Sequence, residues 1–83
     1  MMTTTTDRPL YEIAADIRAD WKHIYYGARP YLDALGDLDR MTDTFGVDSA
    51  KWIVAYFLSN ATTWKGPKAR EIKAELRRME SAR

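Results

Sequence analysis

The chain has 83 residues, of which 46% are hydrophobic and 30% charged, and its formal net charge is +1. This balance excludes a disordered chain, and the length leaves room for only one small core. With no cysteine and one histidine, the usual zinc sites and the common nucleophilic catalytic sets cannot be assembled. The longest apolar run, residues 52–58, is far shorter than the about 20 residues of a membrane span. We therefore expect a noncatalytic cytosolic protein that has no cofactor, no metal and no contact with a membrane.

The first two predicted elements are helices that follow a flexible tail over residues 1–8. Apolar residues at steps of three and four predict a first helix over about 9–25, with Thr6 or Asp7 as its cap and Pro9 in its first turn. Gly27 interrupts the pattern, and a second helix is predicted over about 30–45. Its apolar stripe consists of Leu32, Leu35, Leu38, Thr42 and Phe45.

The second half of the chain predicts two further helices. Gly46 is expected to end the second helix, and Asp48 to cap a third over about 49–62. The third helix is apolar on nearly all sides over 52–58, which favours a central place in the core. A buried strand is the competing interpretation, but the sequence offers no second strand-like run to pair with it. Gly66 and Pro67 then precede a fourth helix over about 67–80.

Together these elements predict an all-α fold, a compact bundle of four short helices in a single domain over 9–81. The charge is split along this bundle. Residues 1–50 carry nine acids against five bases, a net −4, and residues 51–83 carry eight bases against three acids, a net +5. Such a dipolar distribution is a clue to the surfaces that partners touch.

On a helical wheel the surplus charge reduces to two stripes. The acidic stripe lies on the first helix and the basic stripe on the fourth, at steps of three and four residues. Three interpretations stay open: the stripes pair within one molecule, both are simply solvated faces, or the basic stripe binds an acidic protein or nucleic acid. The acidic stripe is Glu12, Asp16 and Asp20, and the basic stripe is Arg70, Lys73 and Arg77 with Lys65 and Lys68 beside it.

Three aromatic residues, Tyr26, Tyr31 and Trp64, occupy predicted turns and fit the apolar stripes poorly. They are either core residues or exposed interface anchors. Trp64 is of special interest because it stands beside the basic helix. The predicted partner-binding residues are Arg70, Lys73, Arg77, Lys65, Lys68 and Trp64.

A basic fourth helix after a glycine turn also favours a helix-turn-helix-like protein that binds nucleic acid through this helix. The pattern departs from that motif at Thr62, where a small apolar residue is usual, and at Pro67, which directly follows Gly66. The acidic first half of the chain would also repel phosphate unless it is turned away. Nucleic-acid binding is therefore the alternative function.

Three segments, LYEIAADIRADWK, YYGARPYLDAL and FGVDSAKWIVAYFLSNATTWKGPKAREIKAEL, resemble the small orphan proteins encoded by actinobacterial phages and prophages. The likeness covers residues 10–76 and implies a phage accessory protein that acts in the host cytosol. It implies no cofactor and no site residue. The leading hypothesis is a noncatalytic protein–protein interaction module that binds a host or phage protein, or a second copy of itself.

Overall fold

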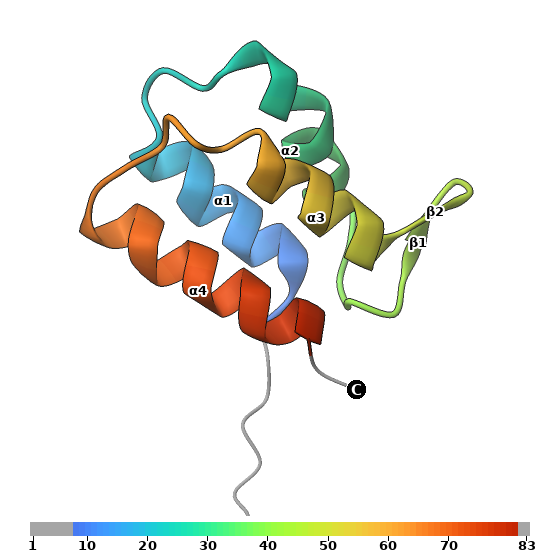
Figure 1. Cartoon of the computed structure of the whole chain (residues 1–83). Coiled ribbons are helices and arrows are strands. Elements are labelled where there is room, and N and C mark those ends of the chain that lie inside the picture. Colours follow the sequence, from blue (N-terminus) through green and yellow to red (C-terminus); the bar gives the residue numbers. More distant parts are fainter. Residues whose placement is uncertain (1–7, 82–83) are drawn as a thin grey trace, which may run out of the picture.

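The computed structural model describes residues 8–81 and shows a small helical globule with one short hairpin (Figure 1). Helices dominate, so the all-α expectation holds for most of the fold, but it missed the two-stranded sheet. In chain order the elements are α1 (Leu10–Asp20), the 3₁₀ helix η1 (Tyr26–Ala28), α2 (Arg29–Leu35), β1 (Thr44–Phe45), β2 (Asp48–Ser49), α3 (Ala50–Ser59) and α4 (Pro67–Ser81).

The four α-helices share one core. α2 and α4 each pack against both α1 and α3, and they lie on opposite sides of the bundle (Figure 1). The expected central position of the third helix holds in part: α3 packs against α2, α4 and β2, but α1 is flanked by the same two helices and α3 leaves Trp52 and Tyr56 exposed. Residues 52–58 are helical, so the competing strand interpretation is also wrong.

Apolar periodicity correctly predicted the buried faces of the first and last helices. Within α1 and α4 every predicted stripe residue is at most 3% exposed, and the described part of the chain has no buried polar or charged residue. The first stripe was predicted to continue through Trp21, Ile24 and Ala28, which lie beyond α1; Trp21 and Ala28 are buried, whereas Ile24 is half-buried. The buried faces consist of Leu10, Ile13, Ala14 and Ile17 on α1, and Ala69, Ile72, Leu76 and Met79 on α4.

The first helix is shorter than predicted, ending at Asp20 instead of near residue 25. The backbone becomes extended at Trp21, whose ring packs on Phe57 and Trp64 with centroid distances of 6.2 and 5.7 Å. Because Phe57 and Trp64 are far from Trp21 in the sequence, the local periodicity of the first helix could not predict these contacts. The start of α1 also uses distant partners, because the amides of residues 10 and 11 donate to carbonyl oxygens of residues 39 and 38 at 2.8 and 2.9 Å. The expected caps Thr6 and Asp7 lie outside the described residues.

The second helix is less than half its predicted length, because α2 ends at Leu35. A loop follows in which the Asp43 carboxylate accepts hydrogen bonds from the amides of Asp39 and Arg40 at 3.1 and 2.9 Å. Of the predicted stripe, Leu32, Leu35 and Leu38 are buried, whereas Thr42 and Phe45 are exposed. A carboxylate that holds backbone amides stabilises a turn at the expense of a helix.

The hairpin replaces the predicted end of the second helix. Thr44 pairs with Ser49 and Phe45 with Asp48, so two residues form the turn. Gly46, the first of them, has a φ of 66°, the positive value that type II′ turns need at this position. The cap of α3 is Ser49, whose Oγ accepts from the amide of Trp52 at 3.3 Å, and not Asp48 as predicted.

Candidate interaction surfaces

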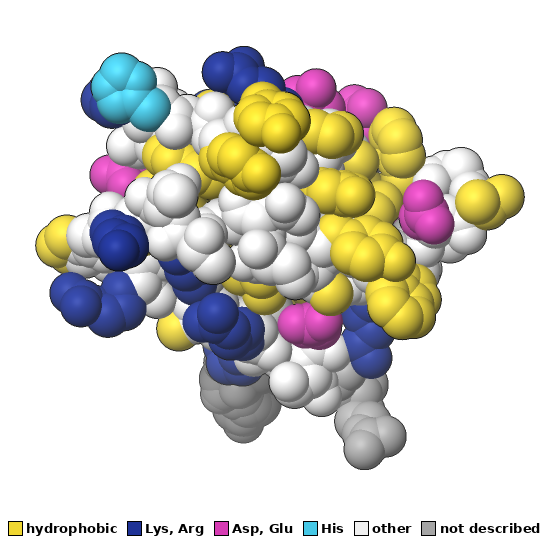
Figure 2. All heavy atoms as spheres, turned by 45° about the horizontal axis from the view of Figure 1, so that its top comes forward, with side chains coloured by type: hydrophobic (Ala, Val, Ile, Leu, Met, Phe, Trp, Pro, Cys, Tyr) yellow, Lys and Arg dark blue, Asp and Glu magenta, His cyan; other side chains and the backbone are white. Residues whose placement is uncertain are grey.

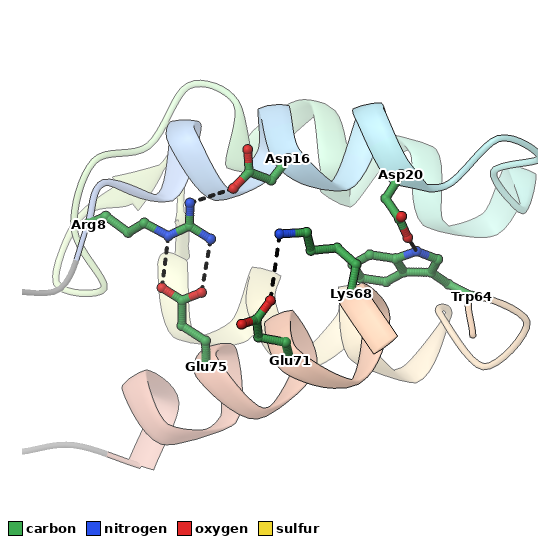
Figure 3. A network of polar contacts seen from close by, with 7 residues as sticks. All are labelled: Arg8, Asp16, Asp20, Trp64, Lys68, Glu71 and Glu75. Carbon is green, nitrogen blue, oxygen red and sulfur yellow. Dashed lines mark hydrogen bonds and ion pairs between the residues drawn. The ribbon is translucent and has the colours of Figure 1, made fainter. Parts of the chain in front are cut away.

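Arg8 ties the start of the described chain to two helices (Figure 3). Its Nε and Nη2 donate to the two carboxylate oxygens of Glu75 on α4 at 2.9 and 3.0 Å. Its Nη1 donates to Asp16 on α1 at 2.5 Å. Hydrogen bonds to Glu75 and then Asp16 raise the pKa of Arg8 above its usual range. Arg8 is therefore fixed and does not belong to a flexible tail; residues 1–7, the rest of that predicted tail, lie outside the described residues.

The acidic stripe of α1 is used within the molecule, but not by the basic stripe of α4. Asp16 is paired with Arg8, and Asp20 accepts a hydrogen bond from the indole Nε1 of Trp64 at 2.9 Å. Among residues 8–81, no ion pair joins Glu12, Asp16 or Asp20 to Arg70, Lys73 or Arg77. The interpretation in which the two stripes neutralise each other is therefore wrong.

Trp64 is a core residue, only 2% exposed, so the prediction that it is an exposed anchor is wrong. Its ring stacks on Trp21 at an interplanar angle of 15° and meets Phe57 edge-on, with centroids 6.4 Å apart. Lys73 Nζ donates to the backbone oxygen of Trp64 at 2.6 Å and lies 5.8 Å from the ring centroid. Trp64 thus anchors the loop before α4, and it also fixes the place of one basic side chain.

Four cations lie along one side of α4 and the loop before it, and we call Lys65, Arg70, Lys73 and Arg77 the α4 basic cluster. Burial lowers the pKa of Lys73, and the positive charges of Arg77 and Lys65 lower it further. The structure thus brings together four of the five predicted basic residues. The fifth, Lys68, is turned to another flank, where its Nζ lies 3.6 Å from Glu71 (Figure 3). A hollow of about 290 Å³ beside the cluster is lined by Trp64, Lys65, Gly66, Ala69, Arg70 and Lys73.

Three rings on α2 and α3 form a second surface, which we call the aromatic row: Tyr31, Tyr56 and Trp52. The ring centroids of Tyr31 and Tyr56 are 5.4 Å apart, and those of Tyr56 and Trp52 are 5.8 Å apart. Trp52 is 60% exposed and Tyr56 44%, while Tyr31 is half-buried against the core. Figure 2 shows hydrophobic side chains gathered on this side of the molecule.

The sequence contained a signal for the aromatic row that the prediction did not use. Trp52 and Tyr56 are four residues apart and so share one face of α3. The buried residues Ile53, Val54 and Phe57 occupy the other faces. The apolar character of residues 52–58 predicted a helix covered on several sides, and the face with Trp52 and Tyr56 is the one that stays exposed.

A hollow of about 600 Å³ lies next to Trp52, between the first half of α3 and the last turn of α4. It is lined by Ser49, Lys51, Trp52, Ala55, Glu80 and Ser81. Its wall is therefore an exposed indole, with one cation and one anion at the rim.

Tyr26, on η1, is 76% exposed, as the anchor interpretation requires, and the centroids of its ring and the Tyr25 ring are 4.9 Å apart.

No metal site or membrane-spanning helix accompanies these surfaces in the described part of the chain. Within residues 8–81, no group of three or more His, Asp or Glu side chains is placed to hold a metal ion. None of the helices in that range combines the length and apolar character that crossing a membrane requires. In comparisons with known proteins, no family model, no curated protein and no solved structure matches the chain.

The connection from α3 to α4, residues 60–66, is longer than the three- or four-residue turn of a helix-turn-helix.

Proposed function

We propose that this chain is a noncatalytic protein-interaction module whose binding surface is the aromatic row. The observation that carries the proposal is the exposure of Trp52 and Tyr56 as neighbouring rings on one helix. Isolated exposed apolar residues are common, whereas a contiguous exposed patch of aromatic rings is typical of an interface. Tryptophan and tyrosine are also the side chains that most often dominate binding energy.

The row is suited to binding because its rings are already held in place. Tyr56 is packed between Tyr31 and Trp52, and all three are carried by helices. Two χ angles per ring leave little rotamer freedom to lose when a partner covers them. We propose that a partner inserts an apolar side chain into the hollow beside Trp52 and places polar groups near Lys51 and Glu80 at its rim.

The proposed partner is a host or phage protein, which agrees with the resemblance of the sequence to small phage proteins. A second copy of this chain is the alternative partner. Sedimentation of the purified protein separates these two, because a second copy would give a concentration-dependent dimer that the Trp52→Ala substitution abolishes. A monomer at all concentrations would leave a different protein as the partner.

Quantitative co-purification from an actinobacterial extract tests the aromatic row. The double variant Trp52→Ala/Tyr56→Ala is compared with wild type and with Tyr11→Ala, which removes an exposed ring on α1 (52% exposed). Truncating an interface anchor costs about 2–4 kcal/mol, or about 30- to 1,000-fold in affinity. We expect a partner that wild type and Tyr11→Ala retain equally and that the double variant loses. Equal retention by a folded double variant would refute the assignment of this surface.

A further inference from the structure

The α4 basic cluster is a separate surface from the aromatic row, and its cations have no anionic partner in the described part of the chain. Among residues 8–81, no ion pair involves Lys65, Arg70, Lys73 or Arg77. The two acids of α4 nearest in sequence are engaged elsewhere, Glu71 with Lys68 and Glu75 with Arg8. We propose that the α4 basic cluster binds the phosphate backbone of duplex DNA, a function beyond protein binding by the aromatic row.

The spacing of the cluster suits a row of phosphates. Arg70, Lys73 and Arg77 follow each other at helical steps of three and four, so they share one face and span about 10 Å along α4. One strand of a duplex presents a phosphate about every 3.4 Å along the axis. The cluster can therefore meet about three phosphates, and the two arginines can each donate a pair of hydrogen bonds.

The cluster is held ready for an anion. Lys73 is fixed by its hydrogen bond to the Trp64 backbone oxygen. Burial, and after it the charges of Arg77 and Lys65, disfavour its protonated form and lower its pKa, and an arriving phosphate would offset the repulsion between these charges. Lys65 extends the positive surface past the hollow at the start of α4.

The same surface fits a duplex better than a single strand or an acidic protein. Proteins that hold single strands stack exposed rings on the bases, but the ring at this hollow is Trp64, which is 2% exposed. Protein partners are usually held by apolar anchors, and apart from Trp64 the uncharged lining consists of Gly66 and Ala69. A duplex backbone needs neither a stacking ring nor an apolar pocket.

Five acids of the negative half lie away from this surface, and Asp16 and Asp20 on α1, the helix beside α4, are engaged by Arg8 and by the indole of Trp64. The acids at positions 33, 37, 39, 43 and 48 lie on α2, on the loop after it and on the hairpin. α2 and the first turns of α4 are on opposite sides of the bundle (Figure 1). In Figure 2 many of the Lys and Arg side chains gather on the side away from the hairpin. The repulsion of phosphate that the sequence predicted for the acidic half is therefore reduced by the fold.

Fluorescence anisotropy with a short mixed-sequence DNA duplex tests the proposal. Three to four phosphate contacts give a slope of log K against log salt of about −2.7 to −3.6, so affinity falls about 40- to 150-fold between 50 and 200 mM salt. The variant Arg70→Gln/Arg77→Gln removes two contacts and should reduce the slope by about 2. The control Arg40→Gln/Lys51→Gln loses the same charge from exposed sites outside the cluster and should keep the wild-type slope.

Three results would overturn the proposal. They are an absence of duplex binding at about 50 mM salt, an equal loss of affinity in the cluster variant and its control, and tighter binding of a single strand or an acidic peptide than of the duplex. Circular dichroism of each variant checks that the fold is intact, which is expected because Arg70 and Arg77 are exposed. The Trp52→Ala/Tyr56→Ala variant should bind the duplex like wild type, so failure of the aromatic row and failure of the basic cluster are distinguishable.

Discussion

Replacing two tryptophans in turn gives the sharpest test of the fold, because Trp64 and Trp52 are chemically identical but differ in burial. Trp64 is 2% exposed and Trp52 60% exposed. Removing a buried tryptophan side chain costs about 3–5 kcal/mol through lost transfer energy and the cavity that remains. A domain of this length has a free energy of unfolding of only about 4–12 kcal/mol. We expect Trp64→Ala to remove a large share of the stability, or all of it.

Trp52→Ala should cost about 0.5–1 kcal/mol, because the lost contact is mainly the exposed ring pair with Tyr56. Guanidinium denaturation followed by circular dichroism measures both variants without depending on tryptophan fluorescence. With an m-value of about 2 kcal/mol per M, the midpoint should fall by about 1.5–2.5 M for Trp64→Ala and by less than about 0.5 M for Trp52→Ala.

The milder substitution Trp64→Phe separates packing from hydrogen bonding. It keeps a ring against Trp21 and Phe57 but removes the indole donor to Asp20. We expect Trp64→Phe to lower the free energy of unfolding by about 1–2 kcal/mol. The loss should be smaller when Asp20→Ala is already present, because that substitution removes the acceptor of the indole hydrogen bond. Equal midpoint shifts for Trp64→Ala and Trp52→Ala would refute the assignment of Trp64 to the core.

Three further predictions concern the polar contacts that position the elements. Ser49→Ala removes the cap of α3 and should cost about 0.5–1 kcal/mol in chemical denaturation, toward the low end for a cap because its hydrogen bond to the Trp52 amide is long. Arg8→Gln leaves two facing carboxylates, Asp16 and Glu75, and should cost about 1 kcal/mol at low salt and less at about 1 M salt. Backbone hydrogen bonds from Arg40 and then Asp39 lower the pKa of Asp43, so its ionised form stabilises the fold above about pH 4. That contribution should be lost as the pH falls through the lowered pKa, and a pH series of unfolding free energies should show a smaller loss in Asp43→Asn.

Matched controls lie on the same elements. Ser59→Ala removes an exposed hydroxyl from the other end of α3 and should change stability by less than about 0.5 kcal/mol. Arg18→Gln breaks an ion pair with Asp33 that is more exposed than the Arg8 contacts, and its effect should be smaller. Asp37→Asn changes an exposed carboxylate in the loop of Asp43 and should change stability by less than about 0.5 kcal/mol. If a control variant lost as much stability as the variant it is paired with, the contact removed in that variant would not be a specific source of stability.

The sequence was sufficient where a pattern is local. The three- and four-residue periodicity of α1 and α4 predicted their buried faces, because one side of a helix facing a core must be apolar at that spacing. Gly66 and Pro67 correctly marked the start of α4. The i, i+4 spacing of Trp52 and Tyr56 also places these two rings of the aromatic row on one face of α3. The exposure of this face was not predicted, because the neighbouring residues of the helix are apolar as well.

The tertiary structure decided what depends on residues far apart in the chain. α1 ends early because Trp21 packs with Phe57 and Trp64, and the place of Trp64 in the core depends on Asp20, 44 residues away. The basic stripe was predicted from the helical wheel, but only the tertiary structure shows that Arg8 engages Glu75 and that the Trp64 backbone oxygen holds Lys73. Helix propensity and apolar periodicity depend on residues a few positions apart. Burial and ion pairing depend on contacts between helices and loops that are far apart in the sequence.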